Sequence, residues 1–256
     1  MIAAALLVSC SGKSQEDTAP ADTDGTSAPA VTDVVTDEPT APAVPQIELV
    51  TKTENIGSLQ GSTKTFIYPK VTLNGSADLA DRINRELEVA CTNLYKRSLP
   101  GATSMVNGGA EIVYKTTECN TYLHNDRYLY VEFFVTIDVF TGGSDEMPSR
   151  AYSAVLIDIA TGELCYPERL IKDLDRLKNA LESGVFTVSD GVELTKNDIS
   201  EALVQYRTDY GIYPSVYFDG ERASVCVELA KLQGGYALFY ISADKATEYF
   251  TNDFIG

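Results

Sequence analysis

The chain has 256 residues, a formal net charge of −17 and 44% hydrophobic residues. A surface this acidic repels nucleic acid and anionic lipid head groups, so we expect neither as a direct partner. It would attract a cationic protein, although solubility alone also favours such a balance in an exported protein. No segment approaches the roughly 20 apolar residues of a membrane-spanning helix.

The N-terminus carries an export pattern. The apolar run Ile2–Leu7 leads into Leu7-Val8-Ser9-Cys10. This order resembles a bacterial lipoprotein signal, which predicts that residues 1–9 are removed as a signal peptide and that Cys10 is lipidated. The lipid would hold the protein at the outer face of the bacterial cytoplasmic membrane, in the cell envelope. The run is short and lacks Lys or Arg, which a start codon placed too far downstream would explain.

Residues 10–46 have the composition of a tether. They are rich in Pro, Thr, Ala and Asp, and hold seven acidic residues against the single Lys13. Such a segment buries too little apolar surface to offset its ordering entropy, so we predict that it is disordered. As a flexible coil it would span roughly 30–36 Å. The remaining chain, from residue 47 onward, keeps a net charge of −11.

In the chain from residue 47 onward, which we call the body, the sequence first predicts two strands, Ile47–Asn55 and Lys64–Leu73. The clearest helix of the chain follows them. Ser76 is the expected N-cap of that helix, and Pro100-Gly101 is expected to end it. One apolar stripe along the helix follows from spacings of three and four residues. It consists of Leu79, Ile83, Leu87, Ala90 and Leu94.

Three longer strands are predicted next, over Glu111–Leu123, Arg127–Phe140 and Arg150–Ile159, with a tight turn at Asn125-Asp126 between the first two. The middle strand alternates strictly, so its apolar residues share one face. Its other face is mixed rather than polar. That face carries Tyr128, Tyr130, Glu132, Phe134, Thr136, Asp138 and Phe140.

Shorter elements complete the chain. Helices are expected over Pro167–Glu182 and Lys196–Tyr206, the second capped by Thr195 and Asp198. Three strands and a last helix are expected over Ser215–Phe218, Ala223–Leu229, Tyr236–Ile241 and Asp244–Phe250. Strands grouped apart from helices predict an α+β fold, with a largely antiparallel sheet and one long and several short helices.

The order of these elements resembles a pair of bacterial modules of unknown function. They form the extracellular sensor of the anti-sigma-V factor and the N-terminal part of some peptidoglycan deacetylases. The first module is indicated by Tyr68-Pro69-Lys70 and the helix with Ile83-Asn84-Arg85-Glu86. The second is indicated by Thr141-Gly142-Gly143 and by Asp158-Ile159-Ala160-Thr161-Gly162-Glu163-Leu164 leading into Pro167-Glu168-Arg169-Leu170. The family commonly has Gly-Gly-Ala-His where this chain has Gly142-Gly143-Ser144-Asp145.

The resemblance implies two modules, residues 47–140 and 141–256, packed as one body. In the anti-sigma-V factor the sensor binds lysozyme, a strongly cationic enzyme. The present sequence contains neither the anti-sigma segment nor a deacetylase domain, so the resemblance implies binding rather than signalling or catalysis.

Four cysteines follow Cys10, namely Cys91, Cys119, Cys165 and Cys226. Outside the cytoplasm they allow two disulfides, yet their places in helix and strand patterns also suit four buried thiols. No cluster has metal-ligand spacing, and no phosphate loop or dinucleotide motif occurs. We therefore predict no cofactor and no metal.

Candidate functional residues are few. The single histidine, His124, is expected on the surface beside a turn, and Ser242-Ala243-Asp244-Lys245 matches the S-x-x-K pattern without its companion motifs. Exposed tyrosines make rigid anchors for protein or sugar ligands. The candidates for ligand binding are Tyr128, Tyr130, Asp145, Glu146 and Tyr213.

Three functions remain open. The leading hypothesis is a lipid-anchored, non-catalytic binding module that recognises a protein or cell-wall ligand, with a cationic lysozyme-like enzyme as the sharpest candidate. The second is a hydrolase or esterase that acts on peptidoglycan, which would need a cleft with polar residues of perturbed pKa. The third is a structural envelope lipoprotein.

Overall fold

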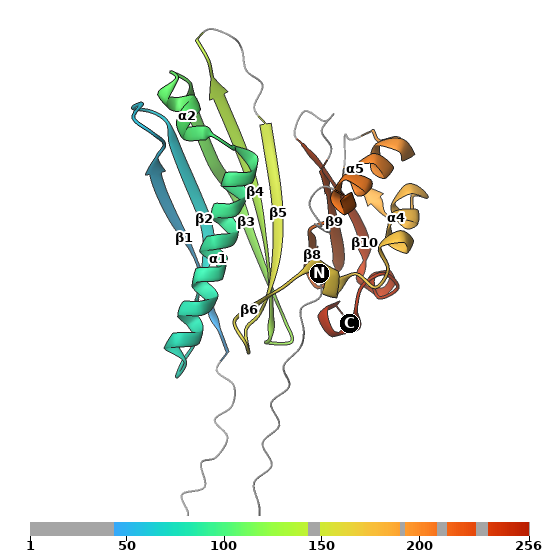
Figure 1. Ribbon diagram of the computed structural model, residues 1–256. Coiled ribbons are helices and arrows are strands. Elements are labelled where there is room, and N and C mark those ends of the chain that lie inside the picture. Colours follow the sequence, from blue (N-terminus) through green and yellow to red (C-terminus); the bar gives the residue numbers. More distant parts are fainter. Residues whose placement is uncertain (1–43, 143–148, 190–192, 209–213, 229–234, 256) are drawn as a thin grey trace, which may run out of the picture. The chain divides into compact units, whose positions relative to one another are not determined.

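The structure is a computed structural model that describes residues 44–142, 149–189, 193–208, 214–228 and 235–255 (Figure 1). It confirms the predicted α+β class with mostly antiparallel strand pairing, distributed over two sheets. Residues 41–256 form one compact unit. The predicted signal peptide, Cys10 and nearly all of the predicted tether lie outside the described residues.

The first sheet has six strands in the order β1-β2-β3-β4-β5-β6. Their bounds are Gln46–Asn55, Thr63–Thr72, Glu111–His124, Tyr128–Phe140, Ser149–Asp158 and Glu163–Cys165. Only the β2–β3 pair of this sheet is parallel, because a helical crossover separates these two strands. The predicted module boundary at residues 140 and 141 lies inside this sheet, since β5 and β6 follow it.

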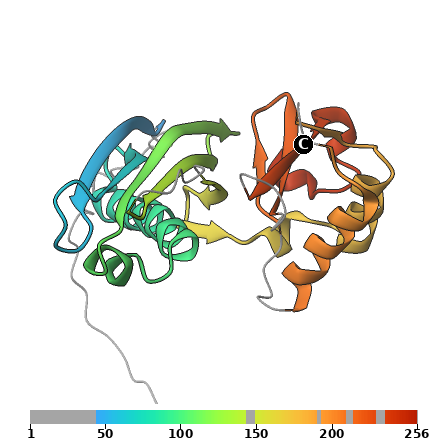
Figure 2. The same ribbon diagram turned by 90° about the horizontal axis from the view of Figure 1, so that it is seen from above.

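The crossover contains the long helix α1 (Ala77–Ser98), which lies against one face of the first sheet (Figure 2). Its buried residues are Ala80, Ile83, Leu87, Cys91 and Leu94, so the predicted stripe is confirmed except that Leu79 and Ala90 lie at its margins. Ser76 holds the N-cap position without a side-chain cap hydrogen bond. The sequence did not predict the short helix α2 (Ala102–Asn107) that follows.

Strand β4 is buried on both faces, which explains its mixed second face. Leu129, Val131 and Phe133 pack into the core beneath α1. Tyr130, on the opposite face, belongs to a second core together with residues of the second sheet. The hairpin into β4 turns at Asn125 and Asp126, whose φ values of 51° and 52° lie in the left-handed region, and the Arg127 N–H closes the turn by donating to the His124 carbonyl at 3.1 Å.

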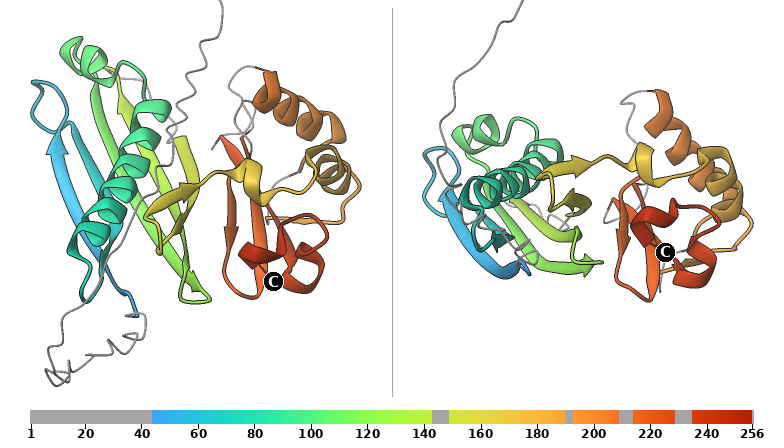
Figure 3. Two further views of the ribbon diagram at one scale, coloured as in Figure 1. Left: turned by 60° about the horizontal axis from the view of Figure 1, so that its bottom comes forward. Right: turned by 90° about the horizontal axis from the view of Figure 1, so that it is seen from below.

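The second sheet has four antiparallel strands in the order β7-β10-β9-β8. Their bounds in that order are Thr187–Val188, Tyr236–Ser242, Arg222–Glu228 and Val216–Phe218. The helices of this half of the chain are α3 (Pro167–Leu170), α4 (Leu174–Glu182), α5 (Lys196–Thr208), α6 (Ala243–Ala246) and α7 (Asn252–Ile255). Figure 3 shows α4 and α5 side by side next to this sheet.

Two predicted helices differ from the observed ones. The helix predicted over Pro167–Glu182 is divided because the Asp173 side chain caps α4, accepting from the Arg176 N–H at 3.0 Å. The helix predicted over Asp244–Phe250 ends at Ala246 as α6, and Phe250 pairs with Ile171 in a β-bridge.

The predicted Thr195/Asp198 cap of α5 is confirmed by reciprocal hydrogen bonds. No helix among the described residues is long and apolar enough to cross a bilayer.

The motif from Asp158 to Gly162 forms the β5–β6 turn. Asp158 accepts from the Ala160 N–H at 3.0 Å and pairs with Arg127 at 2.7 Å. Gly162 has φ +70°, and a Cβ there would lie 2.9 Å from Leu79 of α1. The motif therefore has a structural explanation in this turn.

The four cysteines of the body are free, buried thiols. Burial raises the pKa of Cys91 and of Cys119 to about 12, and it also raises the pKa of Cys165 and Cys226.

We predict that the full chain with Cys10→Ser exposes no thiol to a thiol reagent when folded, because only the thiolate reacts. In denaturant without a reductant all four should react. Fewer than four reactive thiols under those conditions would reveal a disulfide.

Candidate functional site

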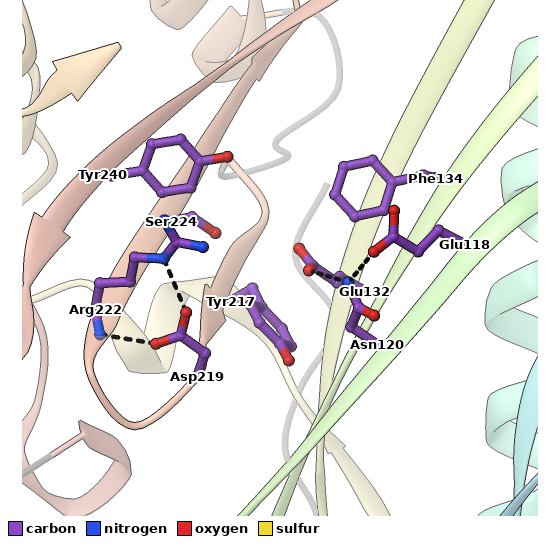
Figure 4. A pocket seen from close by; sticks show the side chains of 9 residues that line it. All are labelled: Glu118, Asn120, Glu132, Phe134, Tyr217, Asp219, Arg222, Ser224 and Tyr240. Atoms are coloured by element: carbon purple, nitrogen blue, oxygen red, sulfur yellow. Dashed lines mark hydrogen bonds and ion pairs between the residues drawn. The ribbon is translucent and has the colours of Figure 1, made fainter. Parts of the chain in front are cut away.

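The candidate site is a cavity of about 150 Å³ between strands of the two sheets. Figure 4 shows its walls facing each other, with residues of β3 and β4 on one side and residues of β8, β9, β10 and the β8–β9 turn on the other. The lining residues are Glu118, Asn120, Glu132, Phe134, Tyr217, Asp219, Arg222, Ser224 and Tyr240.

A β-bulge in β3 directs two of these residues into the cavity. The register of β3 against β4 shifts between Thr116 and Glu118, so Thr117 is the extra residue. The Thr117 hydroxyl donates to the Phe134 carbonyl at 3.2 Å. Even-numbered residues before the bulge, such as Tyr114, face the α1 core, whereas Cys119 takes that face after it. Glu118 and Asn120 therefore face the second sheet.

One amide nitrogen joins two carboxylates on this wall. Asn120 Nδ2 donates to Glu118 Oε1 at 2.9 Å and to Glu132 Oε1 at 3.0 Å. The Tyr152 hydroxyl donates to the other oxygen of Glu132 at 2.8 Å. Both acids are thus held in place by neutral donors.

Glu132 is unusual for a carboxylate because it is only 7% exposed. Burial raises the pKa of Glu132, and the hydrogen bonds from Asn120 and Tyr152 oppose this rise only in part. The charges of Glu118 and Asp219 act in the same direction as burial. A buried carboxylate with a displaced pKa in a cavity marks a candidate functional site.

The opposite wall carries an ion pair. Arg222 Nε donates to Asp219 Oδ2 at 2.9 Å, and its guanidinium lies 4.7 Å from the centre of the Tyr240 ring. Burial alone would raise the pKa of Asp219, but hydrogen bonds from Arg222 and from the Glu221 N–H outweigh it and lower this pKa. The two acids Glu132 and Asp219 thus have pKa values displaced in opposite directions.

Ser224 lies on the same wall as Arg222, in β9. It is 4% exposed, and its hydroxyl has no hydrogen-bond partner among the described residues. The hydroxyl is near enough to Tyr152 to influence its pKa, but the geometry is not that of a hydrogen bond. Figure 4 shows the hydroxyl directed toward the side of the cavity that carries Glu132.

Of the residues predicted to bind ligand, the structure describes Tyr128 and Tyr130, and neither lines this cavity. Tyr128 is half-buried, with its ring 4.9 Å from that of Phe254. Tyr130 is fully buried and donates its hydroxyl to the Phe254 carbonyl at 2.9 Å, so its ring is not an exposed anchor. The other candidates, Asp145, Glu146 and Tyr213, and the lipidation site Cys10, lie outside the described residues.

The prediction that His124 lies on the surface is wrong. Its side chain is 8% exposed, and its ring stands nearly perpendicular to that of Phe218 at 5.7 Å. Asn125 Nδ2 lies 2.8 Å from His124 Nε2 and accounts for one ring nitrogen. In the described part of the chain, no group of three or more His, Cys, Asp or Glu side chains is arranged to hold a metal ion.

The sequence did contain a signal for the candidate site. Glu132 stands among aromatic residues on the second face of its strand, where a simple core or a simple surface would not place a lone acid. Nothing in the pattern, however, indicates that Ser224 or Asp219 would lie opposite. These contacts depend on the packing of two sheets that are distant in sequence.

Glu132 makes a testable contribution to the pH dependence of stability. Its pKa is raised in the folded state, so between the unfolded and folded pKa values the folded chain holds a proton that the unfolded chain has lost. The free energy of unfolding should therefore fall as pH rises through this window. We expect Glu132→Gln to flatten this part of the curve, measured by urea unfolding between about pH 4 and 7.

The matched control is Glu221→Gln, which removes an acid from the exposed β8–β9 turn. Its curve should keep the wild-type slope. An unchanged slope for Glu132→Gln as well would contradict the assignment of the raised pKa to Glu132.

Comparison with known proteins gives similarity in structure only. No family model and no curated protein matches the sequence. A member of the DUF3298 family from Bacteroides fragilis NCTC 9343 is similar with a TM-score of 0.48 and 10% identity, over 82% of this chain and 95% of that chain. A DUF3298 family protein from Pseudomonas aeruginosa PAO1 is similar with a TM-score of 0.43 and 11% identity, over 84% and 98%. These structural neighbours belong to a family of unknown function.

Proposed function

We propose that this protein is a lipid-anchored binding module at the outer face of the cytoplasmic membrane, which captures a cationic protein or cell-wall ligand without chemistry. The observation that carries the proposal is the cavity in which Glu118 and Glu132 lie together, joined only by the neutral amide of Asn120. Within the described part of the chain, neither carboxylate has an ion-pair partner. A positive group on a ligand would complete this wall.

The charge of the whole body supports the same class of partner. Residues 47 onward carry a net charge of −11, which would speed the encounter with a cationic protein and slow that with an acidic one. A lysozyme-like enzyme fits this requirement, and the sequence resemblance to the anti-sigma-V sensor independently favours it. Lipid on Cys10 and the acidic segment behind it would keep the captured ligand near the membrane.

A second candidate is a hydrolase or esterase that acts on peptidoglycan. It is favoured by the opposite pKa displacements of Glu132 and Asp219, since environments that separate two acids in this way also assign the acid and base of hydrolytic sites. The volume of about 150 Å³ speaks against it, because pockets for small-molecule ligands usually measure roughly 300–1,000 Å³.

The anchor is tested by fractionation. We expect the wild-type chain, expressed in a bacterium that processes lipoproteins, to sediment with membranes and to dissolve only with detergent. Cys10→Ser removes the sulfur that would carry the lipid and should release the protein from the membrane fraction. The control is Cys91→Ser, whose thiol is buried in α1 and should not affect fractionation. Membrane association that survives Cys10→Ser would contradict lipidation at this residue.

The ligand class is tested by titration calorimetry of the full chain with Cys10→Ser against lysozyme. Binding should be strongest near 0.01 M salt, where the Debye length is about 30 Å, and should weaken at least roughly tenfold near 1 M, where it is about 3 Å. An acidic protein of similar size serves as the control and should not bind.

Absence of lysozyme binding at low salt would overturn the lysozyme version of the proposal. The same preparation is also incubated with purified peptidoglycan. Release of soluble fragments that is lost in Glu132→Gln would replace the binding function with the hydrolytic one.

A further inference from the structure

The first wall of the cavity contains an unresolved electrostatic repulsion. Glu118 and Glu132 accept from the same nitrogen of Asn120, so their carboxylates are close neighbours. An amide bears no net charge and does not neutralise them. Two carboxylates at short range repel each other, and the repulsion is stronger where one of them is buried, as Glu132 is.

A second, independent feature is the Ser224 hydroxyl. A buried hydroxyl without a partner costs about 1–3 kcal/mol, and native proteins rarely leave one so. Ser224 lies in the second sheet, whereas the two acids lie in the first. A cationic donor placed in the cavity would donate to Ser224 and give both acids an ion-pair partner, because all three offer acceptor lone pairs.

The opposite wall of the cavity already holds a cation, the guanidinium of Arg222. Arg222 lies between the Asp219 carboxylate and the face of the Tyr240 ring, at 2.9 Å and 4.7 Å respectively. Its side-chain hydrogen bond goes to Asp219, on the β8–β9 turn, and Arg222 forms no ion pair with Glu118 or Glu132, although the charge of Glu132 acts on it across the cavity. The same combination of carboxylate and aromatic ring is repeated on the first wall by Glu118 and Phe134 (Figure 4).

The size of the cavity limits what it can accept. A space of about 150 Å³ admits a group of the size of benzene. It is therefore suited to one side chain and not to a sugar chain or a nucleotide. The Phe134 and Tyr217 rings suit an aliphatic stem and a cationic head, which aromatic faces attract, whereas Arg222 already lies over the Tyr240 ring.

We propose that this cavity receives a single lysine or arginine side chain of the ligand, with its cationic head between Glu118, Glu132 and the Ser224 hydroxyl and its stem along the aromatic rings. The inference rests on the proposed binding function and adds the group by which the ligand is held. It makes the cavity a specific pocket, distinct from the general attraction of an acidic surface.

The test uses short peptides in place of a whole ligand. The full chain with Cys10→Ser is titrated with N-acetyl-Gly-Lys-Gly-amide, with its arginine counterpart and with the norleucine counterpart, and binding is followed by protein NMR. Lysine or arginine should bind at least about tenfold more tightly than norleucine, which has a similar stem and no charge. Shifts should be confined to the residues around the cavity.

Two substitutions examine the pocket itself. Ser224→Ala removes a hydroxyl that has no partner, so the protein should fold normally while the peptide binds several-fold more weakly. Glu118→Gln keeps the shape of an exposed side chain and removes one charge, and should weaken binding by about tenfold. Glu221→Gln removes the same charge from the neighbouring turn, outside the cavity lining, and should leave peptide binding unchanged.

Equal affinity for the lysine and norleucine peptides, or equal loss in Glu118→Gln and Glu221→Gln, would overturn the pocket. Lysozyme binding by the wild-type chain is measured in parallel. If lysozyme binds and the cationic peptides do not, the pocket proposal fails while the binding function stands. If the peptides bind and lysozyme does not, the pocket stands and lysozyme is excluded as the ligand.

Discussion

The burial of β4 on both faces is the constraint on which the rest of the molecule depends. One face completes the core beneath α1, and the other contributes Tyr130 to a core shared with the second sheet. A strand in this position ordinarily carries apolar residues only. Glu132 breaks that rule in the middle of the strand, and its neighbours are arranged to hold its carboxylate with neutral donors rather than to neutralise it.

The bulge at Thr117 places polar side chains next to the buried Glu132 and so forms the first wall of the cavity. Side chains alternate strictly between the two faces of a strand, so one extra residue exchanges the faces of everything that follows. Without it, Glu118 and Asn120 would point toward the apolar core beneath α1, where an unpaired carboxylate is costly. With it, Cys119 enters that core instead, and Asn120 donates to both Glu118 and Glu132.

Much of the fold follows from the sequence, because it is set by local periodicity. The stripe of α1, the alternation of β4 and the Asn125-Asp126 turn are all short-range patterns, and the structure reproduces them. The break before α4, the bulge and the burial of His124 were not predicted. Each depends on a competing contact: the Asp173 cap, the register against β4, and the Phe218 ring. The cavity is harder still to predict from the sequence, since Glu132 and Ser224 line it together only because the two sheets pack against each other.

Because the cavity forms only where the two sheets pack together, it differs from the acidic surface in the kind of recognition that it allows. A surface charge of one sign attracts any cationic partner, and salt weakens that attraction uniformly. Ser224 is buried with a hydroxyl that has no partner among the described residues, and Glu132 is buried without an ion-pair partner, so both gain from a cationic group that enters the cavity and donates hydrogen bonds there. Such groups discriminate sharply, because a ligand that lacks the donor leaves them unpaired. In the proposed binding function, the acidic body would account for encounter, and the paired acids with the unpartnered hydroxyl would account for selection.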